Sequence, residues 1–267
     1  MNKFYIKIVL FFLSVSLYVN NKVLAAEHAR EIDTPSEEMD RCLTPEEIFV
    51  IHQHLLCTNP EETKQARKLM DEAVKHLEHH ATSTDGYEYY PTKLHYRMMS
   101  YKKKLENKTN IIKVNFRVHK LDEYYDIIYT MWDPNGDHIF NFGVNKIARV
   151  YDPSLVIIQR RYDKKILSRR KYFYALVKRA RISENKTIIV MTSANINDHN
   201  ISGKTYKNTI IENANLFTTD IDSEDDIKKG KLTKTFVNIA GYIVEKKGNI
   251  IEITYIESVS NIQTLIA

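Results

Sequence analysis

Two β-rich runs decide the fold of this chain, Lys171-Tyr-Phe-Tyr-Ala-Leu-Val-Lys-Arg-Ala-Arg-Ile182 and Thr187-Ile-Ile-Val-Met-Thr-Ser-Ala194. The segment between them, Ser183-Glu-Asn-Lys186, has the composition of a tight turn. Both runs are rich in β-branched and aromatic residues, so the three stretches together predict an antiparallel hairpin.

Similar runs on both sides of this hairpin predict further strands, with turns such as Asp152-Pro153 and Lys246-Lys-Gly-Asn249 between them. From Val144 onward the sequence predicts strands alone: Val144–Tyr151, Leu155–Tyr162, Lys171–Ile182, Thr187–Ala194, Asn208–Thr218, Leu232–Glu245 and Ile250–Ser258. Two more are expected earlier, at Lys93–Lys102 and around Val114, where apolar and polar residues alternate. A sheet of about nine antiparallel strands must curl because strands twist, and its concave face must then be filled. Side chains, a helix or a ligand can each fill it.

Three helices are predicted ahead of this strand-rich part. Thr44-Pro45-Glu46-Glu47 and Asn59-Pro60-Glu61-Glu62 each supply a capping side chain, a proline at the first helical position and an early glutamate. We therefore place a short helix within residues 44–58 and a long one from Pro60, whose apolar face is formed by Ala66, Leu69, Met70, Ala73, Val74 and Leu77. A third helix, with an apolar stripe that ends at Trp132, is stopped by Asp133-Pro134. Helices and sheet together predict an α+β fold.

The composition is that of a globular protein. The chain has 267 residues, of which 43% are hydrophobic and 27% charged, enough for a sizeable core. At its start, Lys3 and Lys7 precede the apolar run Ile8–Val19, and Ala25-Ala26 follow. This layout predicts a secretory signal over residues 1–26, because the run is short for a bilayer span; an uncleaved anchor or a buried helix is the alternative. Residues 27–43 are polar and predict a flexible leader, and the main domain is expected over residues 59–267.

Residues with catalytic or metal-binding chemistry form no familiar motif. The sequence holds no Gly-x-Ser-x-Gly elbow, phosphate-binding glycine loop or dinucleotide fingerprint, so we expect no enzyme activity and no cofactor. His76 and His80 lack both the His-Glu-x-x-His frame and a third ligand, so no metal site is predicted. Cys42 and Cys57 can form at most one disulfide, or remain inert thiols. The acidic run Asp220–Asp226 is interpreted as a solvated loop.

The stretch Arg160–Arg181 is strongly basic, with ten Lys and Arg residues against the single acid Asp163. Such a stripe can meet nucleic acid or an anionic membrane surface, and a merely solvated hairpin is the alternative. Because a secreted chain rarely meets nucleic acid, we expect transient contact with a membrane surface and no nucleic-acid partner. A monomer is predicted.

Five sequence motifs are similar to motifs of a known family: Ile128-Tyr-Thr-Met-Trp-Asp-Pro134, Phe142-Gly-Val-Asn-Lys-Ile-Ala-Arg-Val-Tyr-Asp-Pro153, Arg170-Lys-Tyr-Phe-Tyr-Ala175, Ile189-Val-Met-Thr-Ser-Ala-Asn195 and Val237-Asn-Ile-Ala-Gly-Tyr-Ile-Val244. They resemble the fam-a family of rodent malaria parasites (Plasmodium), and the resemblance runs from about Pro60 to Ser258. It implies a START-like helix-grip fold, in which a curved antiparallel sheet surrounds a lipid tunnel closed by a C-terminal helix. Only Val259–Ala267 follows Ser258, so we expect this closing helix to be missing.

The resemblance also implies a function. Members are associated with binding and moving phosphatidylcholine and with export into the infected red cell. We therefore expect a non-enzymatic carrier of one phospholipid, most often phosphatidylcholine, that is secreted into the parasitophorous vacuole or exported to the host erythrocyte. The candidate lining residues are Trp132, Arg149, Tyr151, Arg160, Tyr174 and Val190. Arginine is proposed for the lipid phosphate because its fork binds two oxygens at once; packing or surface charge is the alternative role of each residue. A host-facing interaction or antigenic protein that has lost lipid transfer is the alternative function.

Overall fold

The computed structural model describes residues 42–91, 98–105, 109–134, 143–162, 169–202 and 206–260. The predicted signal segment 1–26, nearly all of the 27–43 leader, and residues 93–97 of one predicted strand lie outside these ranges. So do residues 261–267, on which the expected absence of a closing helix depends. Within the described ranges, no helix combines the length and the apolar character needed to cross a bilayer.

The two predicted helix starts are confirmed by their caps. Helix α2 (Pro45–Ile51) begins with a capping box, in which Thr44 Oγ1 accepts from the Glu47 amide at 3.2 Å and the Glu47 carboxylate accepts from the Thr44 amide at 2.8 Å. The long helix α3 (Pro60–Thr82) begins where Asn59 Oδ1 accepts from the amides of Glu61 and Glu62. Each cap satisfies amides that have no partner within the helix, which fixes where the helix begins. The short 3-10 turn η1 (Gln53–Leu55) links the two helices.

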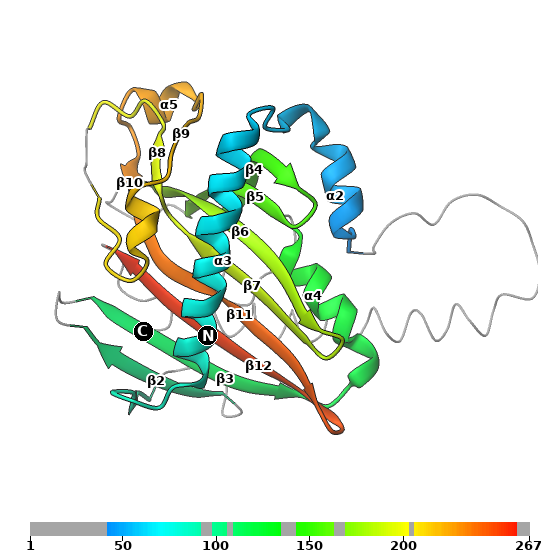
Figure 1. Cartoon of the computed structure of the whole chain (residues 1–267). Coiled ribbons are helices and arrows are strands. Elements are labelled where there is room, and N and C mark those ends of the chain that lie inside the picture. The colour runs from blue at the N-terminus through cyan, green and yellow to red at the C-terminus, as the bar shows by residue number, and fades with distance from the viewer. Residues whose placement is uncertain are drawn as a thin grey trace, which may run out of the picture.

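One large sheet forms the body of the molecule (Figure 1). Its strands are β1 (Glu88–Tyr89), β2 (Met99–Lys104), β3 (Asn110–Val118), β4 (Gly143–Asp152), β5 (Leu155–Tyr162), β6 (Lys171–Ser183), β7 (Lys186–Thr192), β10 (Thr233–Lys234), β11 (Phe236–Lys247) and β12 (Ile250–Ser260). Among the described residues, nine strands follow the order β1-β2-β3-β12-β11-β7-β6-β5-β4, all antiparallel, and β10 adds a short parallel pairing to β6. The predicted hairpin is the β6–β7 pair.

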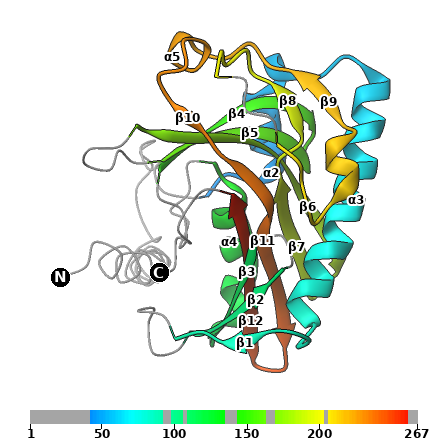
Figure 2. The ribbon, with the colours of Figure 1, turned by 90° about the vertical axis from the view of Figure 1, so that its left-hand side faces the viewer.

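The sheet has an apolar layer on each face. On one face, the apolar side of α3 packs with alternate sheet residues such as Ile157, Ile188 and Val190. On the other, concave face lie α2 and α4 (Tyr124–Trp132), the latter preceded by the 3-10 turn η2 (Leu121–Glu123). Figure 2 shows α3 and α4 on opposite sides of the sheet. Neighbouring residues in one strand therefore belong to different cores, as the period of two requires.

The segment predicted as the strand Asn208–Thr218 is not a strand, which corrects the sequence analysis. Asn208 Oδ1 accepts from the amides of Ile210 and Ile211, both at 2.9 Å, and a 3-10 turn η3 (Glu212–Asn215) follows. These side-chain bonds offer the backbone an alternative to a sheet ladder. The region instead forms the short parallel pair β8 (Asn195–Asn197) and β9 (Thr218–Asp220), followed by the one-turn helix α5 (Asp225–Lys228).

Strands β7 and β11 approach each other closely at Gly241. This residue has φ +154°, and a Cβ there would lie 2.1 Å from the Ile189 carbonyl oxygen. Only glycine fits such a position without moving a strand. Gly241 therefore sets the contact between two central strands of the sheet.

Candidate functional site

The concave face of the sheet carries a small internal cavity. Its walls are Ile48 of α2, Met131 and Trp132 of α4, Pro134 just after α4, and residues from six adjacent strands. The wall residues from the strands are Asn145, Ile147, Val156, Ile158, Arg160, Val177, Ile189, Met191, Tyr242 and Tyr255. Most of these side chains are apolar, and they belong to the core between the sheet and the helices α2 and α4.

A buried arginine supplies the positive charge of this cavity. Arg160 is 6% exposed, its Nε donates to Asn145 Oδ1 at 2.7 Å, and its guanidinium lies 5.2 Å from the centre of the Phe173 ring. Asn145 donates in turn to the Pro134 carbonyl at 3.2 Å. The cavity wall thus presents a buried cation.

Aromatic residues close the cavity beside Arg160. Trp132 is 7% exposed and its buried Nε1–H has no hydrogen-bond partner in the described part of the chain. The rings of Tyr242 and Tyr255 pack with centres 4.9 Å apart. Burial raises the pKa of the Tyr255 hydroxyl well above its ordinary value, with the charge of Glu257 acting in the same direction. Burial likewise raises the pKa of Tyr162. The phenols here are therefore neutral at physiological pH.

The cavity is narrow, which differs from the open tunnel that the sequence analysis expects. The space that the centre of a water molecule can reach is about 40 Å³. Sites for drug-sized ligands usually measure about 300–1,000 Å³. Side chains of α4, chiefly Met131 and Trp132, meet those of the sheet and leave room for little more than water. Between α4 and the sheet, the chain's own residues fill the space.

Two of the six predicted lining residues, Trp132 and Arg160, are brought together at this cavity. Their role in lipid binding remains a prediction. Val190 lies on the opposite face in the core under α3, between Ile189 and Met191, which do line the cavity. Because alternate residues of β7 face opposite sides of the sheet, Val190 does not line the cavity, which corrects the prediction for this residue.

Arg149 and Tyr151 also lie on the α3 side, where they hold Glu62. Arg149 Nη1 and the Tyr151 hydroxyl each donate to Glu62 Oε1 at 2.7 Å. Asn145 and Ile147 of the same strand line the cavity, but a bulge between Ile147 and Arg149 shifts the alternation. The bulge therefore turns Arg149 and Tyr151 away from the cavity and toward the start of α3.

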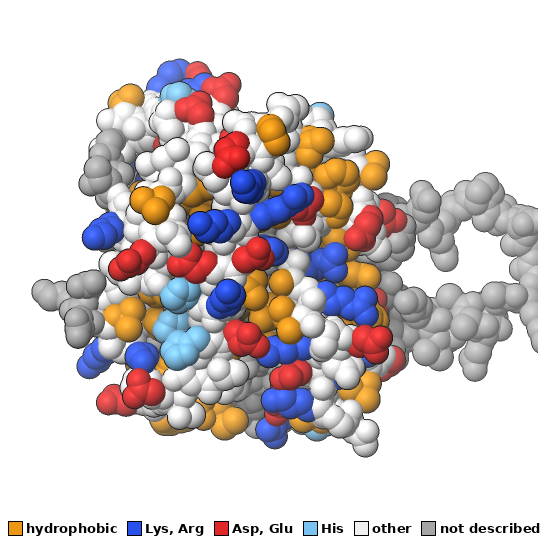
Figure 3. Space-filling model, in the orientation of Figure 1, with side chains coloured by type: hydrophobic (Ala, Val, Ile, Leu, Met, Phe, Trp, Pro, Cys, Tyr) orange, Lys and Arg blue, Asp and Glu red, His pale blue; other side chains and the backbone are white. Residues whose placement is uncertain are grey.

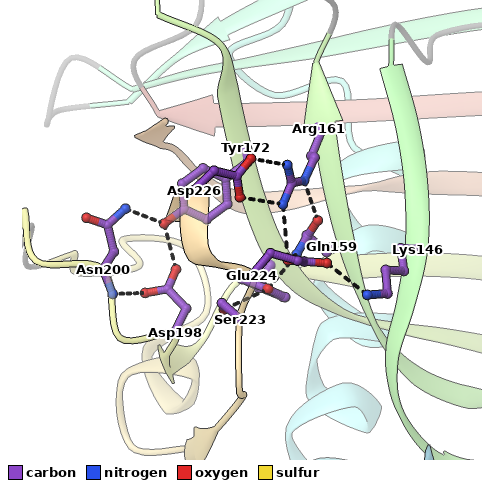
Figure 4. A network of polar contacts seen from close by, with 10 residues as sticks. Lys146, Gln159, Arg161, Tyr172, Asp198, Asn200, Ser223, Glu224 and Asp226 are labelled. Atoms are coloured by element: carbon purple, nitrogen blue, oxygen red, sulfur yellow. Dashed lines mark hydrogen bonds and ion pairs between the residues drawn. The ribbon is translucent and has the colours of Figure 1, made fainter. Parts of the chain in front are cut away.

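Tyr174, the remaining lining candidate, belongs to a polar network on the α3 side of the sheet. Its hydroxyl accepts from Gln159 Nε2 at 2.6 Å and hydrogen-bonds Ser223 Oγ at 2.8 Å. Figure 4 shows Gln159, Ser223 and their partners converging from β4, β5 and the segment before α5. This network joins Ser223 and Glu224, which precede α5, to the sheet.

The same network corrects the interpretation of Asp220–Asp226 as a solvated loop. Arg161 forms a two-pronged ion pair with Asp226, at 2.6 and 3.0 Å, and a third contact with Glu224 at 3.1 Å (Figure 4). Lys146 Nζ donates to Glu224 at 2.8 Å. The two acids therefore attach the segment to β4 and β5.

The basic stretch Arg160–Arg181 does not form one surface stripe among its described residues. Arg160 faces the cavity while Arg161 binds acids on the opposite face. Lys178 pairs with Asp71 of α3, and Arg179 lies 3.6 Å from Glu46 of α2. Most of these cations thus serve contacts within the chain.

Cysteines and histidines do not assemble a site among the described residues. Cys42 and Cys57 are free thiols: Cys42 Sγ lies 3.0 Å from Thr130 Oγ1, and Cys57 contacts the Asn59 carbonyl, so the disulfide alternative is not realised. No group of three or more His, Cys, Asp or Glu side chains able to hold a metal occurs in that part of the chain. His80 instead hydrogen-bonds the Tyr87 hydroxyl through Nδ1 at 3.2 Å.

Sequence reasoning missed several cavity residues, notably Asn145, Met191, Tyr242 and Tyr255. Asn145 carries no clear signal, because Lys146 and Arg149 of the same predicted strand are polar as well. The two tyrosines lie on strands far apart from Arg160 in the sequence, and only the strand order β12-β11-β7-β6-β5 brings them to one surface.

The architecture is that of an α+β protein with a START-like helix-grip sheet, and comparison with solved structures confirms this fold class. Human StAR-related lipid transfer protein 5 matches with a TM-score of 0.52 at 11% sequence identity, over 73% of this chain and 82% of that chain. Human STARD10 matches with a TM-score of 0.48 at 11% identity, over 73% of this chain and 70% of that chain. No protein-family model and no curated protein matches the sequence.

Proposed function

We propose that this chain is a non-enzymatic lipid carrier that binds one phospholipid, phosphatidylcholine, and transfers it between membranes. The observation that carries the proposal is the apolar concave face of a START-like sheet, covered by α4 and holding a buried arginine. Human StAR-related lipid transfer protein 5, which shares the fold, is a lipid transfer protein by name. The partner proposed is the lipid itself, with transient membrane contact and a monomeric protein.

Lipid entry in this proposal requires α4 to move away from the sheet, because the closed cavity is far smaller than a two-chain lipid. Acyl chains would then replace the side chains of Met131 and Trp132 against the sheet. Each methylene removed from water contributes about 0.8 kcal/mol, so two acyl chains supply a large driving force for the exchange. The free-energy cost of the exchange is the loss of the contacts between α4 and the sheet. The acyl chains replace these contacts with apolar contacts of their own.

The head group would lie beside Arg160. A phosphate accepts hydrogen bonds only, and the cavity wall offers the buried guanidinium of Arg160 as a donor. A guanidinium can bind two phosphate oxygens at once. Burial strengthens that attraction because the surroundings of Arg160 have a low dielectric constant.

The finer assignment to the fam-a family rests on the five sequence motifs quoted above. With it we propose secretion through the segment 1–26, into the parasitophorous vacuole or onward to the host erythrocyte. Detection of the chain in those compartments by tagging tests this part separately from lipid binding.

One observation favours a second function. The space between α4 and the sheet is almost completely filled, with about 40 Å³ left. A START-like scaffold that no longer opens would serve as a host-facing interaction or antigenic surface. That protein would bind no lipid and transfer none.

Native mass spectrometry and a vesicle transfer assay distinguish the two functions. The carrier should acquire one phosphatidylcholine per chain and move fluorescent phosphatidylcholine between vesicles. Arg160→Met should lower both, whereas Arg149→Met, which removes an arginine from the opposite face, should lower neither in the folded fraction. A chain that stays free of lipid and transfers none would refute the carrier and support the interaction protein.

A further inference from the structure

Helix α2 is apolar on its outer side as well as on the side that faces the core. Within Ile48-Phe-Val-Ile51, Ile48 is 2% exposed, whereas Val50 and Ile51 are 67% and 54% exposed. Leu56, just after η1, adds a further side chain that is 39% exposed. A run of exposed aliphatic residues on a short helix is unusual for a surface that meets only water. We call Val50, Ile51 and Leu56 the α2 patch.

The α2 patch lies next to the proposed lipid site. Ile48, two residues before Val50, is a wall of the cavity, so one helix contacts the cavity with one side and solvent with the other. Figure 3 shows hydrophobic side chains gathered over the part of the surface where Figure 1 places α2. The helix is therefore positioned between the cavity and whatever covers the patch.

Charge at the patch selects the kind of surface that could cover it. Pro45–Leu56 contains no Lys or Arg and two acids, Glu46 and Glu47. Glu46 lies 3.6 Å from Arg179, and Glu47 is engaged in the capping box. The only basic residues of Pro45–Leu56 are His52 and His54. A segment that has no Lys or Arg is drawn only weakly to an anionic membrane, whereas its aliphatic side chains can enter a neutral one. The chemistry of the patch thus fits a zwitterionic lipid surface.

We propose that α2 is the membrane-docking element of this protein and that the α2 patch inserts into zwitterionic phosphatidylcholine bilayers, next to the cavity wall that Ile48 forms. The inference rests on the proposed lipid-carrier function and adds the place and the lipid chemistry of docking. Insertion of Val50, Ile51 and Leu56 replaces their contact with water by contact with acyl chains. Because Ile48 belongs to the same helix, docking also acts on a wall of the cavity.

The test compares two double variants of the full chain. Val50→Gln with Ile51→Gln removes two aliphatic side chains of the patch without adding charge. Glutamine is well tolerated in helices, so α2 should be retained. Ile201→Gln with Leu216→Gln is the matched control, because these aliphatic side chains are 78% and 77% exposed and lie outside α2. We expect the patch variant to lose about tenfold or more in binding to phosphatidylcholine vesicles, from the apolar area no longer buried. The control should bind like the wild type, and added salt should change neither.

A probe at the site reports insertion independently of any other membrane-binding segment. An environment-sensitive dye attached at Ile51→Cys, with Cys42 and Cys57 changed to Ser, should shift to the blue on phosphatidylcholine vesicles, whereas the same dye at Ile201→Cys should not. Equal binding by both double variants together with an unshifted dye at position 51 would overturn the proposal. Binding that needs phosphatidylserine and disappears in salt would also overturn it. A third contrary outcome would be a dimeric wild type and a monomeric patch variant that bind vesicles equally well, because the patch would then be a dimer interface.

Uptake of a water-soluble short-chain phosphatidylcholine separates failure of docking from failure of lipid binding. This ligand reaches the cavity without a membrane, so the patch variant should bind it like the wild type while failing to extract lipid from vesicles. If the wild type does not bind the soluble lipid, the carrier function itself fails. If both proteins bind it and both extract lipid from vesicles equally, the docking proposal alone fails.

Discussion

Asn145 and Arg160 are direct cross-strand partners on β4 and β5, and Arg160 Nε donates to Asn145 Oδ1 at 2.7 Å inside the concave core. Asn145 is 9% and Arg160 6% exposed. Because Asn145 also donates to the Pro134 carbonyl, one amide links the buried cation to the segment that follows α4. The position of the cation and that of the helix covering it are thus coupled.

Replacing Asn145 by leucine should destabilise the fold. The substitution removes the acceptor of Arg160 Nε and the donor to Pro134, and an unsatisfied buried polar group costs about 1–3 kcal/mol. Urea denaturation of Asn145→Leu should show this loss. The double variant Asn145→Leu with Arg160→Met should be more stable than the sum of the two single losses predicts, since it leaves no charge to satisfy. Strictly additive losses would contradict the coupling.

Glu224 should give the protein part of its sensitivity to acid. Burial opposes its ionisation, but hydrogen bonds from Lys146 and Gln159 outweigh burial and lower the pKa of Glu224 to about 2. Because the folded pKa lies below the ordinary value of 4.5, its stabilising contribution is complete above that value and is lost as the pH falls toward 2. Glu224→Gln should therefore be less stable than the wild type at neutral pH, and the difference in unfolding free energy should shrink near about pH 3. The matching substitution at exposed Asp222, Asp222→Asn, should change the unfolding free energy much less. If the difference between Glu224→Gln and the wild type does not depend on pH, the ion pairs of Glu224 are not its cause.

His80 should make the stability of the protein depend on pH in a higher range than Glu224 does. Burial, followed by the charges of His79 and His76, lowers the pKa of His80 from 6.5 to about 4. Between about pH 6.5 and 4, the His80 imidazole is therefore protonated in the unfolded chain but not in the folded chain. The unfolding free energy falls as the pH drops through this range. His80→Gln should remove that part of the slope, amounting to as much as about 3 kcal/mol. Guanidinium denaturation across this range measures it, with His54→Gln on the exposed 3-10 turn as the control that should keep the slope.

Gly241 should be one of the least replaceable residues of the sheet. An alanine Cβ would lie 2.1 Å from the Ile189 carbonyl oxygen, so Gly241→Ala must push β7 and β11 apart. We expect a loss of more than about 2 kcal/mol in unfolding free energy. Gly248→Ala is the matched control, because φ is also positive there but nothing lies within 4 Å of the new methyl group. That control should cost about 1–2 kcal/mol, and equal losses at the two sites would show that strand contact is not the cause.

Local patterns predicted the elements whose ends depend on local chemistry. The caps at Thr44 and Asn59 locate both helix starts, and β5 has the predicted bounds Leu155–Tyr162. The segment after Asn208 was mispredicted because its residues are typical of a strand, while the Asn208 side chain bonds the amides two and three residues ahead. Such bonds depend on conformation rather than on apolar periodicity.

The candidate site was less predictable, because it depends on which face of the sheet a residue lies on. Alternation shows that Arg160 and Arg161 point to opposite sides, but not which side faces α3. A bulge after Ile147 then reverses the alternation for Arg149 and Tyr151. Phe173, rather than Tyr174, pairs with Arg160 across β5 and β6, so a shift of one residue in register exchanges a residue of the concave core for one of the opposite core.

Filling the cavity should separate lipid binding from stability. Val177 lines the cavity and Val190, on the neighbouring strand, lies in the opposite core; both side chains are buried. A phenylalanine at either site overpacks a core, at a cost of about 1–3 kcal/mol. Val177→Phe should also occupy the space between α4 and the sheet and lower phosphatidylcholine uptake about tenfold or more, whereas Val190→Phe should leave uptake per folded chain unchanged. Native mass spectrometry gives the bound lipid and circular dichroism the folded fraction. Since the two variants share the stability loss and differ in the face they fill, equal uptake by both would mean that lipid does not enter between α4 and the sheet.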